Sequence, residues 1–406
     1  MAHNYMCARN WPLRTPLARD RFAVRVVLLA ALVFLAAATV WAEEGESPRA
    51  KLPSGEKGNK HAAKQSQEDL GSSFNDEGPA SSDRRAKPEP LDELDQSDAS
   101  RLLTRRTEAA IERGLRRLRE SQSPDGRWQG DQSNWVAFNS FAMIAFMLNG
   151  HFPNKKQPYG DCLTRSLDAL LKEAQKPGYN GYIGTNMYAH GLATVALSEA
   201  WGQTEQDDKV RAALKAAVKI ILQAQSPVGG WRYDPQPATA DVSVTAMQVV
   251  ALAAARQAGI FVPDATIDRA VRYVTMCHQP ASGGFTYQAI GGVPGFARTA
   301  AATFSMMMLG RHDAPEVQGG IRYLEEEGRH GAFEKTSHYM YGHYYAALVM
   351  YQAGDEHFRR WYPQIRDILL SMQKKDGSWG HGNGFDMGVP LIILSIPYGY
   401  VPAYQR

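Results

Sequence analysis

The chain of 406 residues is poor in the features that usually point to a familiar function. It contains three cysteines, and neither Cys162 nor Cys277 has a second Cys or a His at zinc-finger spacing. So few cysteines do not form a disulfide framework. The 45 Lys+Arg and 42 Asp+Glu residues leave a net charge of only +3. With no long basic stripe after the N-terminus, we expect no nucleic-acid partner.

Several catalytic motifs are also missing. The sequence has no Gly-x-Ser-x-Gly elbow, no phosphate-binding loop and no His-Glu-x-x-His helix. These absences exclude the common serine hydrolase, nucleotide-binding and zinc protease patterns. We therefore expect no cofactor and no bound metal.

Residues 1–42 have the three-part pattern of a secretory signal. Five arginines lie between residues 9 and 25, an apolar run covers 26–39, and Val40-Trp41-Ala42 offers a cleavage site. The run is short for a spanning helix, which needs about 20 residues. A cleaved signal peptide and an uncleaved signal anchor both fit, and the second would tether the chain to a membrane through 26–39. Either way we expect a secreted or extracytoplasmic protein, periplasmic in a bacterium.

Residues 43–100 differ in composition from the rest of the chain. They are rich in Glu, Lys, Ser, Gly, Asp and Pro, and Phe74 is their only aromatic residue. Such a segment cannot bury enough apolar surface to offset its ordering entropy. We predict a disordered polar linker over 43–100 and a folded domain over 101–406.

An internal repeat carries the fold prediction. A Gln at a helix end, a short Gly-containing turn and an aromatic residue recur together, and the aromatic recurs every 46 to 54 residues. Two weaker copies end at Tyr182 and Phe333. The four clearer copies are Gln122–Trp128, Gln225–Trp231, Gln279–Phe285 and Gln373–Trp379.

Helical patterns of two kinds alternate around these turns. Amphipathic segments such as 109–120 and 210–225 precede a turn, and more apolar segments such as 136–148 and 244–258 follow one. A helix with a polar face belongs at the surface, whereas one that is apolar all round belongs inside. We predict an all-α fold, an α/α toroid in which six outer–inner helical hairpins close an (α/α)6 barrel. An open solenoid of the same hairpins is the less favoured alternative.

The turn pattern Gln-x-x-Asp-Gly-x-Trp resembles the QW repeat of squalene and oxidosqualene cyclases. Gln122–Trp128 and Gln373–Trp379 match it, and the likeness covers about residues 101–406. The chain is most similar to secreted prenyltransferase/squalene-oxidase repeat proteins of the squalene cyclase and protein prenyltransferase superfamily. That resemblance implies a toroid with a central cavity for an isoprenoid or another apolar ligand.

In a closed ring the N-termini of all inner helices face one side, where their dipoles favour an anionic or π-electron-rich ligand. Polar residues at these helix entries are the candidates for ligand binding. Asn134, Asn186 and Asp386 also fit as helix N-caps, whereas His190, Arg298 and His343 require buried partners or a polar cavity. The full set is Asn134, Trp135, Asn186, Tyr188, His190, Asp241, Ser243, Thr245, Arg298, His338, Tyr341, His343 and Asp386.

Asp241-Val-Ser-Val-Thr-Ala246 resembles the Asp-x-Asp-Asp-Thr-Ala motif with which squalene–hopene cyclases protonate an alkene. Ser243 stands at the proton-donating position, and its hydroxyl is far too weak an acid for that step. Prenyltransferases hold zinc with an Asp and a Cys two residues later, and here Ser243 replaces the thiol. Asp241 is therefore the best catalytic candidate, with the chemistry of both families lost or altered.

Three functions remain open from the sequence. The first is a toroid that binds an isoprenoid or other apolar ligand in its central cavity. The second is a non-catalytic extracytoplasmic scaffold for a protein partner that the sequence does not identify. The third is a carbohydrate-active (α/α)6 enzyme, which requires two acids such as Asp241 and Asp386, or a Tyr–His pair, facing one groove.

Overall fold

The computed structural model describes residues 102–128, 134–329 and 338–398, which all lie within one of the two compact units of the chain, residues 57–406. These residues form twelve α-helices and a short 3-10 helix, Ile396–Tyr398, and contain no β-strand. None of the described helices is both long enough and apolar enough to cross a membrane. The predicted signal over 1–42 and the predicted linker over 43–100 lie outside the described residues.

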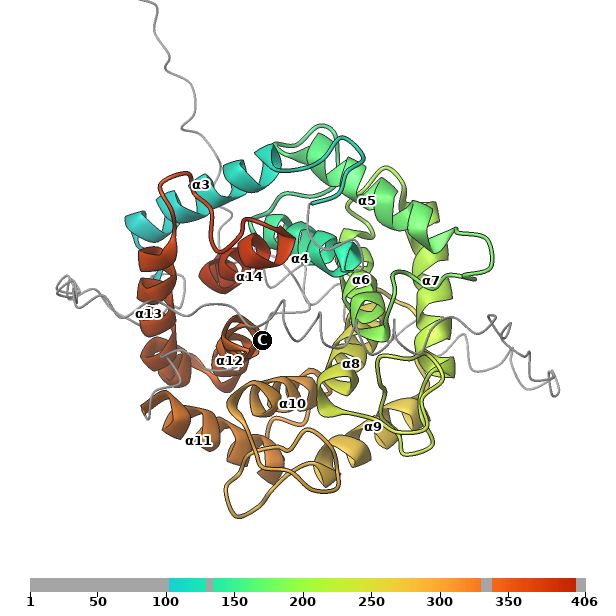
Figure 1. The fold of residues 1–406 in the computed structure, drawn as a ribbon, viewed down its shortest axis with the longest axis vertical. Coiled ribbons are helices and arrows are strands. Elements are labelled where there is room, and N and C mark those ends of the chain that lie inside the picture. The colour runs from blue at the N-terminus through green and yellow to red at the C-terminus, as the bar shows by residue number, and fades with distance from the viewer. Residues whose placement is uncertain (1–101, 129–133, 330–337, 399–406) are drawn as a thin grey trace, which may run out of the picture. The chain divides into compact units, whose positions relative to one another are not determined.

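The helices alternate between two concentric layers (Figure 1). The outer layer consists of α3 (Arg105–Glu120), α5 (Gly160–Ala174), α7 (Asp207–Gln223), α9 (Asp264–Met276), α11 (Pro315–Arg329) and α13 (Asp355–Met372). The inner layer consists of α4 (Trp135–Leu148), α6 (Met187–Ala200), α8 (Val242–Gln257), α10 (Phe296–Met308), α12 (Tyr339–Ala353) and α14 (Gly384–Ser395).

The two layers differ in burial as their sequences predict. In α3 one stripe that includes Ile111, Leu115 and Leu118 is buried, while most of the charged residues remain exposed. In α4 every residue is buried. A helix that is apolar on all sides is stable only when other helices surround it, so the inner layer depends on the outer one.

The ring is closed. The last inner helix, α14, packs against α4 and α3, and the last outer helix, α13, packs against α3. An open solenoid would leave these first and last hairpins apart. The predicted closure of six outer–inner hairpins is therefore confirmed (Figure 1).

The recurring turns join each hairpin to its neighbour. In three of them the Gln side chain donates a hydrogen bond to a backbone carbonyl on the next outer helix. The same Gln accepts a hydrogen bond from an Arg one turn later on that helix. The Trp indole donates to the backbone carbonyl ten residues before it. The Gln donor bonds are Gln122 to Cys162 (2.9 Å), Gln225 to Thr266 (2.9 Å) and Gln373 to Ala110 (2.8 Å), and the arginines are Arg165, Arg269 and Arg113. The indole bonds are Trp128 to Leu118 (2.7 Å), Trp231 to Ile221 (2.8 Å) and Trp379 to Leu369 (2.8 Å).

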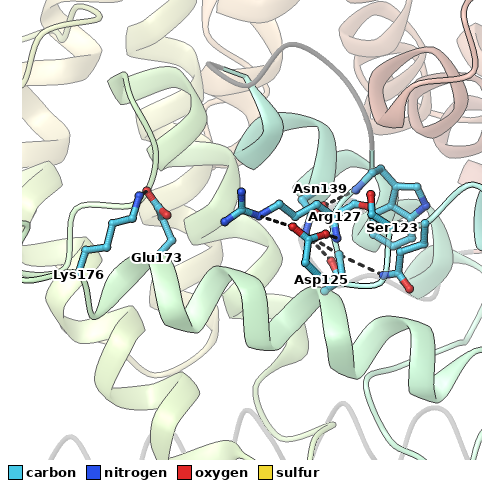
Figure 2. Close-up of polar contacts among 10 residues, drawn as sticks. Ser123, Asp125, Arg127, Asn139, Glu173 and Lys176 are labelled. Carbon is cyan, nitrogen blue, oxygen red and sulfur yellow. Dashed lines mark hydrogen bonds and ion pairs between the residues drawn. The ribbon is translucent and has the colours of Figure 1, made fainter.

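Figure 2 shows the first of these turns. The Ser123 hydroxyl donates to the Arg127 carbonyl (2.9 Å), and the Arg127 guanidinium lies 3.5 Å from the Asp125 carboxylate. The Asn139 side chain, from the next inner helix, accepts the backbone N–H of Trp128 at 3.0 Å. In the same view Lys176 and Glu173 form an ion pair at 2.7 Å near the end of α5. The turn is thus held by its own side chains and by the inner helix that follows.

The bonds of Gln373 lie at the seam where the ring closes, because they link residues about 260 positions apart. We expect Gln373→Ala to lower the free energy of unfolding by ~1–2 kcal/mol, since the carbonyl of Ala110 and the guanidinium of Arg113 lose a partner. Urea denaturation measures the change, and Gln364→Ala is the matched control because the Gln364 side chain bonds only within its own helix. Equal losses of stability in Gln373→Ala and Gln364→Ala would contradict a role of the Gln373 bonds in closing the ring. Full additivity of Gln373→Ala with Arg113→Ala would contradict it as well.

Candidate functional site

The candidate residues at the helix entries fall into groups with different contacts. Asn186 and Asp241 are the N-caps of α6 and α8, and accept the N–H groups of Ala189 and Val244 at 2.9 Å each. Asn134 precedes α4 and is buried without a side-chain cap bond. Its neighbour Trp135 is also buried, with the Arg127 guanidinium 4.0 Å above its ring.

Asp386 accepts hydrogen bonds from the turn that precedes α14. Its Oδ2 accepts from the backbone N–H of His381 at 2.6 Å and from the Asn383 side chain at 3.1 Å. Asn383, and not Asp386, is the N-cap of α14. The Asp386 carboxylate therefore stabilises the entry to α14.

His190 and Thr245 hold the turns in place. Nδ1 of His190 accepts the N–H of Ile183 at 3.0 Å, and Nε2 lies 3.1 Å from the Ala217 carbonyl on α7. The Thr245 hydroxyl accepts the N–H of Trp231 at 2.9 Å. Both residues occupy the fourth position of an inner helix, where Thr299 makes the same bond to Phe285. These contacts give the two side chains a structural role that their sequence position did not reveal.

Burial lowers the pKa of His190 to about 4, so its imidazole is neutral at physiological pH. His343 lies one position further into α12 and is fully buried. Its ring is surrounded by those of Tyr339 (4.5 Å), Phe296 (5.0 Å) and Trp361 (5.9 Å). It therefore packs between α12, α10 and α13.

Asp241 is a fully buried acidic residue of the inner layer. Its side chain is fully buried, and while Oδ1 caps α8, Oδ2 has no hydrogen-bond partner. Burial raises its pKa to about 6, against the opposing effects of the Val244 N–H, the Arg232 charge and the nearby Tyr287 hydroxyl. That hydroxyl is close enough to lower the pKa without completing a hydrogen bond of normal geometry. Asp241 is thus a carboxyl that can exchange a proton near neutral pH.

Two tyrosines from successive turns flank this carboxyl. The carbonyl of Tyr287 accepts the N–H of Val242 at 2.9 Å, and that of Tyr233 accepts the N–H of Met187 at 3.0 Å. Each turn thereby lies over the start of the preceding inner helix. The charge of Asp241 contributes to the raised pKa of both phenols, after burial. Ser243, half-buried, lies against the hydroxyl of a third tyrosine, Tyr341 from α12.

Tyrosines also join opposite sides of the ring. Tyr188 on α6 and Tyr345 on α12 lie on opposite helices of the six-membered inner layer, yet their hydroxyls are 3.4 Å apart. The Tyr345 hydroxyl also donates to Met247 Sδ on α8, at 3.7 Å. The Tyr345 ring contacts the rings of Tyr341 (5.0 Å) and Phe304 (6.0 Å). Tyr188, Tyr345 and Met247 thus form an aromatic floor of side chains across the ring.

Arg298 and His338 lie beside this group. The Arg298 guanidinium folds back over Gly295, where a Cβ would come within 2.6 Å of its Nε. Its charge lowers the pKa of Tyr287, as a lesser cause, and also that of His338, after burial. His338 has a left-handed backbone conformation, with φ 59°, directly before α12.

The structure therefore brings together Asp241, Ser243 and Tyr341, with Arg298 close to Tyr287 and His338 close to Arg298. Asn134, Trp135 and Asp386 lie at the starts of other inner helices, α4 and α14. Sequence reasoning missed Tyr233 and Tyr287, although both stand two residues after a turn aromatic, in the third and fourth repeats. Among the described residues no cluster of three or more His, Cys, Asp or Glu side chains could hold a metal ion.

Comparison with known proteins identifies the fold alone. No family model and no curated protein matches the chain. A variant of the type II terpene cyclase MstE from Scytonema, in complex with geranylgeranyl dihydroxybenzoate, is 14% identical over 73% of this chain and 98% of that chain, with a TM-score of 0.50. An inactive variant of the α-1,6-mannanase GH76A from Salegentibacter sp. HEL1_6, in complex with α-1,6-mannotetrose, is 11% identical over 73% of this chain and 99% of that one, with a TM-score of 0.53.

The chain is an α/α toroid. The two neighbours act on chemically unrelated molecules, so the shared architecture does not select a function. Function must therefore be inferred from the side chains at the helix entries.

Proposed function

We propose that this toroid binds an isoprenoid or a similar apolar small molecule at the N-terminal ends of its inner helices, with Asp241 as the polar anchor. The observation that carries the proposal is the buried Asp241 carboxyl, which has one oxygen without a partner and lies among tyrosines. A terpene cyclase of the same fold binds a geranylgeranyl-bearing ligand, which is consistent with this proposal.

Capping α8 with Asp241 lowers the stability of the fold. An Asn would cap α8 about as well as an Asp and would carry no charge. Burying a carboxylate oxygen without a hydrogen bond is costly. Side chains that lower stability in this way are characteristic of functional sites. A hydroxyl on the ligand would complete the hydrogen bonding of Oδ2.

The tyrosines supply the apolar part of the proposed site. The rings of Tyr233, Tyr287 and Tyr341 offer large, rigid faces against which an unsaturated chain can pack. The floor formed by Tyr188, Tyr345 and Met247 spans the ring. We propose that the ligand lies between that floor and the turns that carry Tyr233 and Tyr287.

Cyclase chemistry is altered or lost in this proposal. Protonating an alkene requires a strong acid, and a carboxyl with a pKa of about 6 is too weak. The acidic groups near Asp241 are the phenols of Tyr233 and Tyr287, whose pKa values its charge raises. Asp241 instead accepts a hydrogen bond or takes a proton from a bound molecule.

A carbohydrate-active enzyme is less well supported. Glycoside hydrolysis by paired acids requires carboxyl groups about 5–10 Å apart across the scissile bond. Asp386 is the second candidate, but its carboxylate is held by His381 and Asn383, and α14 lies opposite α8 in the inner layer. A carboxylate held in this way is a poorer candidate for the second catalytic acid.

Equilibrium dialysis with radiolabelled farnesol tests the proposal. We expect saturable binding, which Asp241→Asn weakens about tenfold because a charge-assisted hydrogen bond is lost while the helix cap is kept. Thr104→Asn is the control, since Thr104 caps the outer helix α3. Hexadecanol, which has the same headgroup on a saturated chain, should bind more weakly, and mannotetraose should not bind. An unchanged affinity in the Asp241 variant would refute the anchor.

A further inference from the structure

Arg298 is a partly buried cation near the Asp241 site. It lies in the first turn of α10, is half-buried, and forms no ion pair with any carboxylate among the described residues. Arg269, on the neighbouring outer helix α9, by contrast donates to the Gln225 side chain at 2.8 Å. A partly buried guanidinium offers five N–H donors in a fixed fork that suits a carboxylate.

The backbone connects Arg298 to the Asp241 site. The segment from Thr286 to Gly295 begins at the start of α8, where the Tyr287 carbonyl accepts the Val242 N–H and the Gln288 side chain donates to the Ala240 carbonyl at 3.4 Å. It ends at Gly295, against which the Arg298 guanidinium packs. Tyr287 is close enough to both Asp241 and Arg298 for each charge to shift its pKa, in opposite directions. Arg298 and Asp241 therefore belong to one neighbourhood.

The local charge favours a monoanion. Burial and the Arg298 charge both lower the pKa of His338, which leaves it mostly neutral at pH 7. Near Tyr287 the guanidinium groups of Arg232 and Arg298 carry two positive charges, and the ionised Asp241 carries one negative charge. The remaining charge of +1 balances a monoanion, whereas a phosphate carries close to two negative charges and would be repelled further by Asp241.

From this geometry we infer that the ligand is an apolar carboxylic acid, whose carboxylate is bound by Arg298 and whose chain lies along Tyr287 toward the aromatic floor. The inference rests on the proposed function, since it assigns the headgroup of a ligand for the same site. The α10 entry lacks a capping side chain, so its free amide groups add to the attraction for the carboxylate.

Three probes with one C15 chain test this inference: farnesol, farnesoic acid and farnesyl monophosphate. We expect the acid to bind at least tenfold more tightly than the alcohol and more tightly than the phosphate at pH 7.5. Arg298→Met should abolish the advantage of the acid over the alcohol. Arg311→Met is the matched control, because Arg311 is exposed beyond the other end of α10. Arg298→Lys, which keeps the charge but loses the fork, should retain part of the advantage.

The outcomes distinguish failure of the carboxylate assignment from failure of the proposed function. Equal affinities of farnesol and farnesoic acid, or an advantage of the acid that survives Arg298→Met, would overturn the carboxylate assignment while the proposed function stands. Tightest binding of the phosphate would also overturn it. If none of the three probes binds to the folded wild-type protein, the proposed function fails as well. Circular dichroism of each variant establishes that the fold is intact.

Discussion

Replacing Gly229 with alanine is expected to lower the free energy of unfolding by about 2–5 kcal/mol. Gly229 has a φ of +98° in the turn between α7 and α8, and a Cβ at this position would lie 2.5 Å from the Arg269 carbonyl oxygen. The left-handed conformation costs a non-glycine residue about 1–2 kcal/mol, and the forced separation of α7 from α9 adds an overpacking cost of about 1–3 kcal/mol. Urea denaturation, followed by circular dichroism, measures the loss.

Gly310 provides the control for backbone conformation. It has a φ of +71°, but no atom lies within 4 Å of the position its Cβ would take. Gly310→Ala should therefore cost only the left-handed term, about 1–2 kcal/mol. If Gly229→Ala and Gly310→Ala lose the same stability, the turns do not hold adjacent hairpins in the close contact described above.

Asp241→Asn is expected to stabilise the protein at pH 7.5 by up to about 3 kcal/mol, and to have little effect near pH 4. The folded pKa of Asp241 is about 6, above the value of about 3.9 for an unfolded Asp. The folded state thus binds the proton more tightly, and ionisation makes folding less favourable as the pH rises from about 4 to 6. The cost persists above pH 6, at about 1.4 kcal/mol for each of about two pKa units. Asparagine keeps the cap and removes that cost.

His190 shifts the stability in the opposite direction over the same pH range. Its folded pKa of about 4 lies below the unfolded value of about 6.5, so stability is lost as the pH falls from 6.5 to 4. The difference between Asp241→Asn and wild type isolates Asp241, because His190 is present in both proteins. Asp161→Asn, an exposed residue in the first turn of α5, is the control. A difference that does not change with pH would mean that the Asp241 carboxyl is not buried as described.

The architecture could be predicted from the sequence because its determinants are local. The turn residues recur at regular spacing, and the alternation of amphipathic and apolar segments distinguishes outer from inner helices. The bonds of Gln122 and Gln373 could not be predicted in this way, since they join residues 40 and 263 positions apart. The predicted signal at 1–42 and linker at 43–100 stay predictions.

The site was only partly predictable, for a related reason. Asp241 and Ser243 share one helix entry, but the position of Tyr341 beside Ser243 depends on how α12 and α8 face each other within the ring. His190 and Thr245 were grouped with the site because polar residues at inner-helix entries suggest ligand contacts. Their partners, the N–H groups of Ile183 and Trp231, are backbone atoms of the turns and leave no trace in side-chain chemistry. The contact between Tyr188 and Tyr345 crosses the ring and has no local pattern.

Mass spectrometry of molecules retained by the purified protein tests the central claim most directly. The wild-type protein is incubated with a lipid extract rich in isoprenoids, separated from free lipid, and extracted with organic solvent. We predict a retained isoprenoid or related apolar molecule, which is lost in Asp241→Asn and kept in Asp161→Asn. A folded wild-type protein that retains no such molecule would contradict a ligand site at Asp241 and would favour a non-catalytic scaffold.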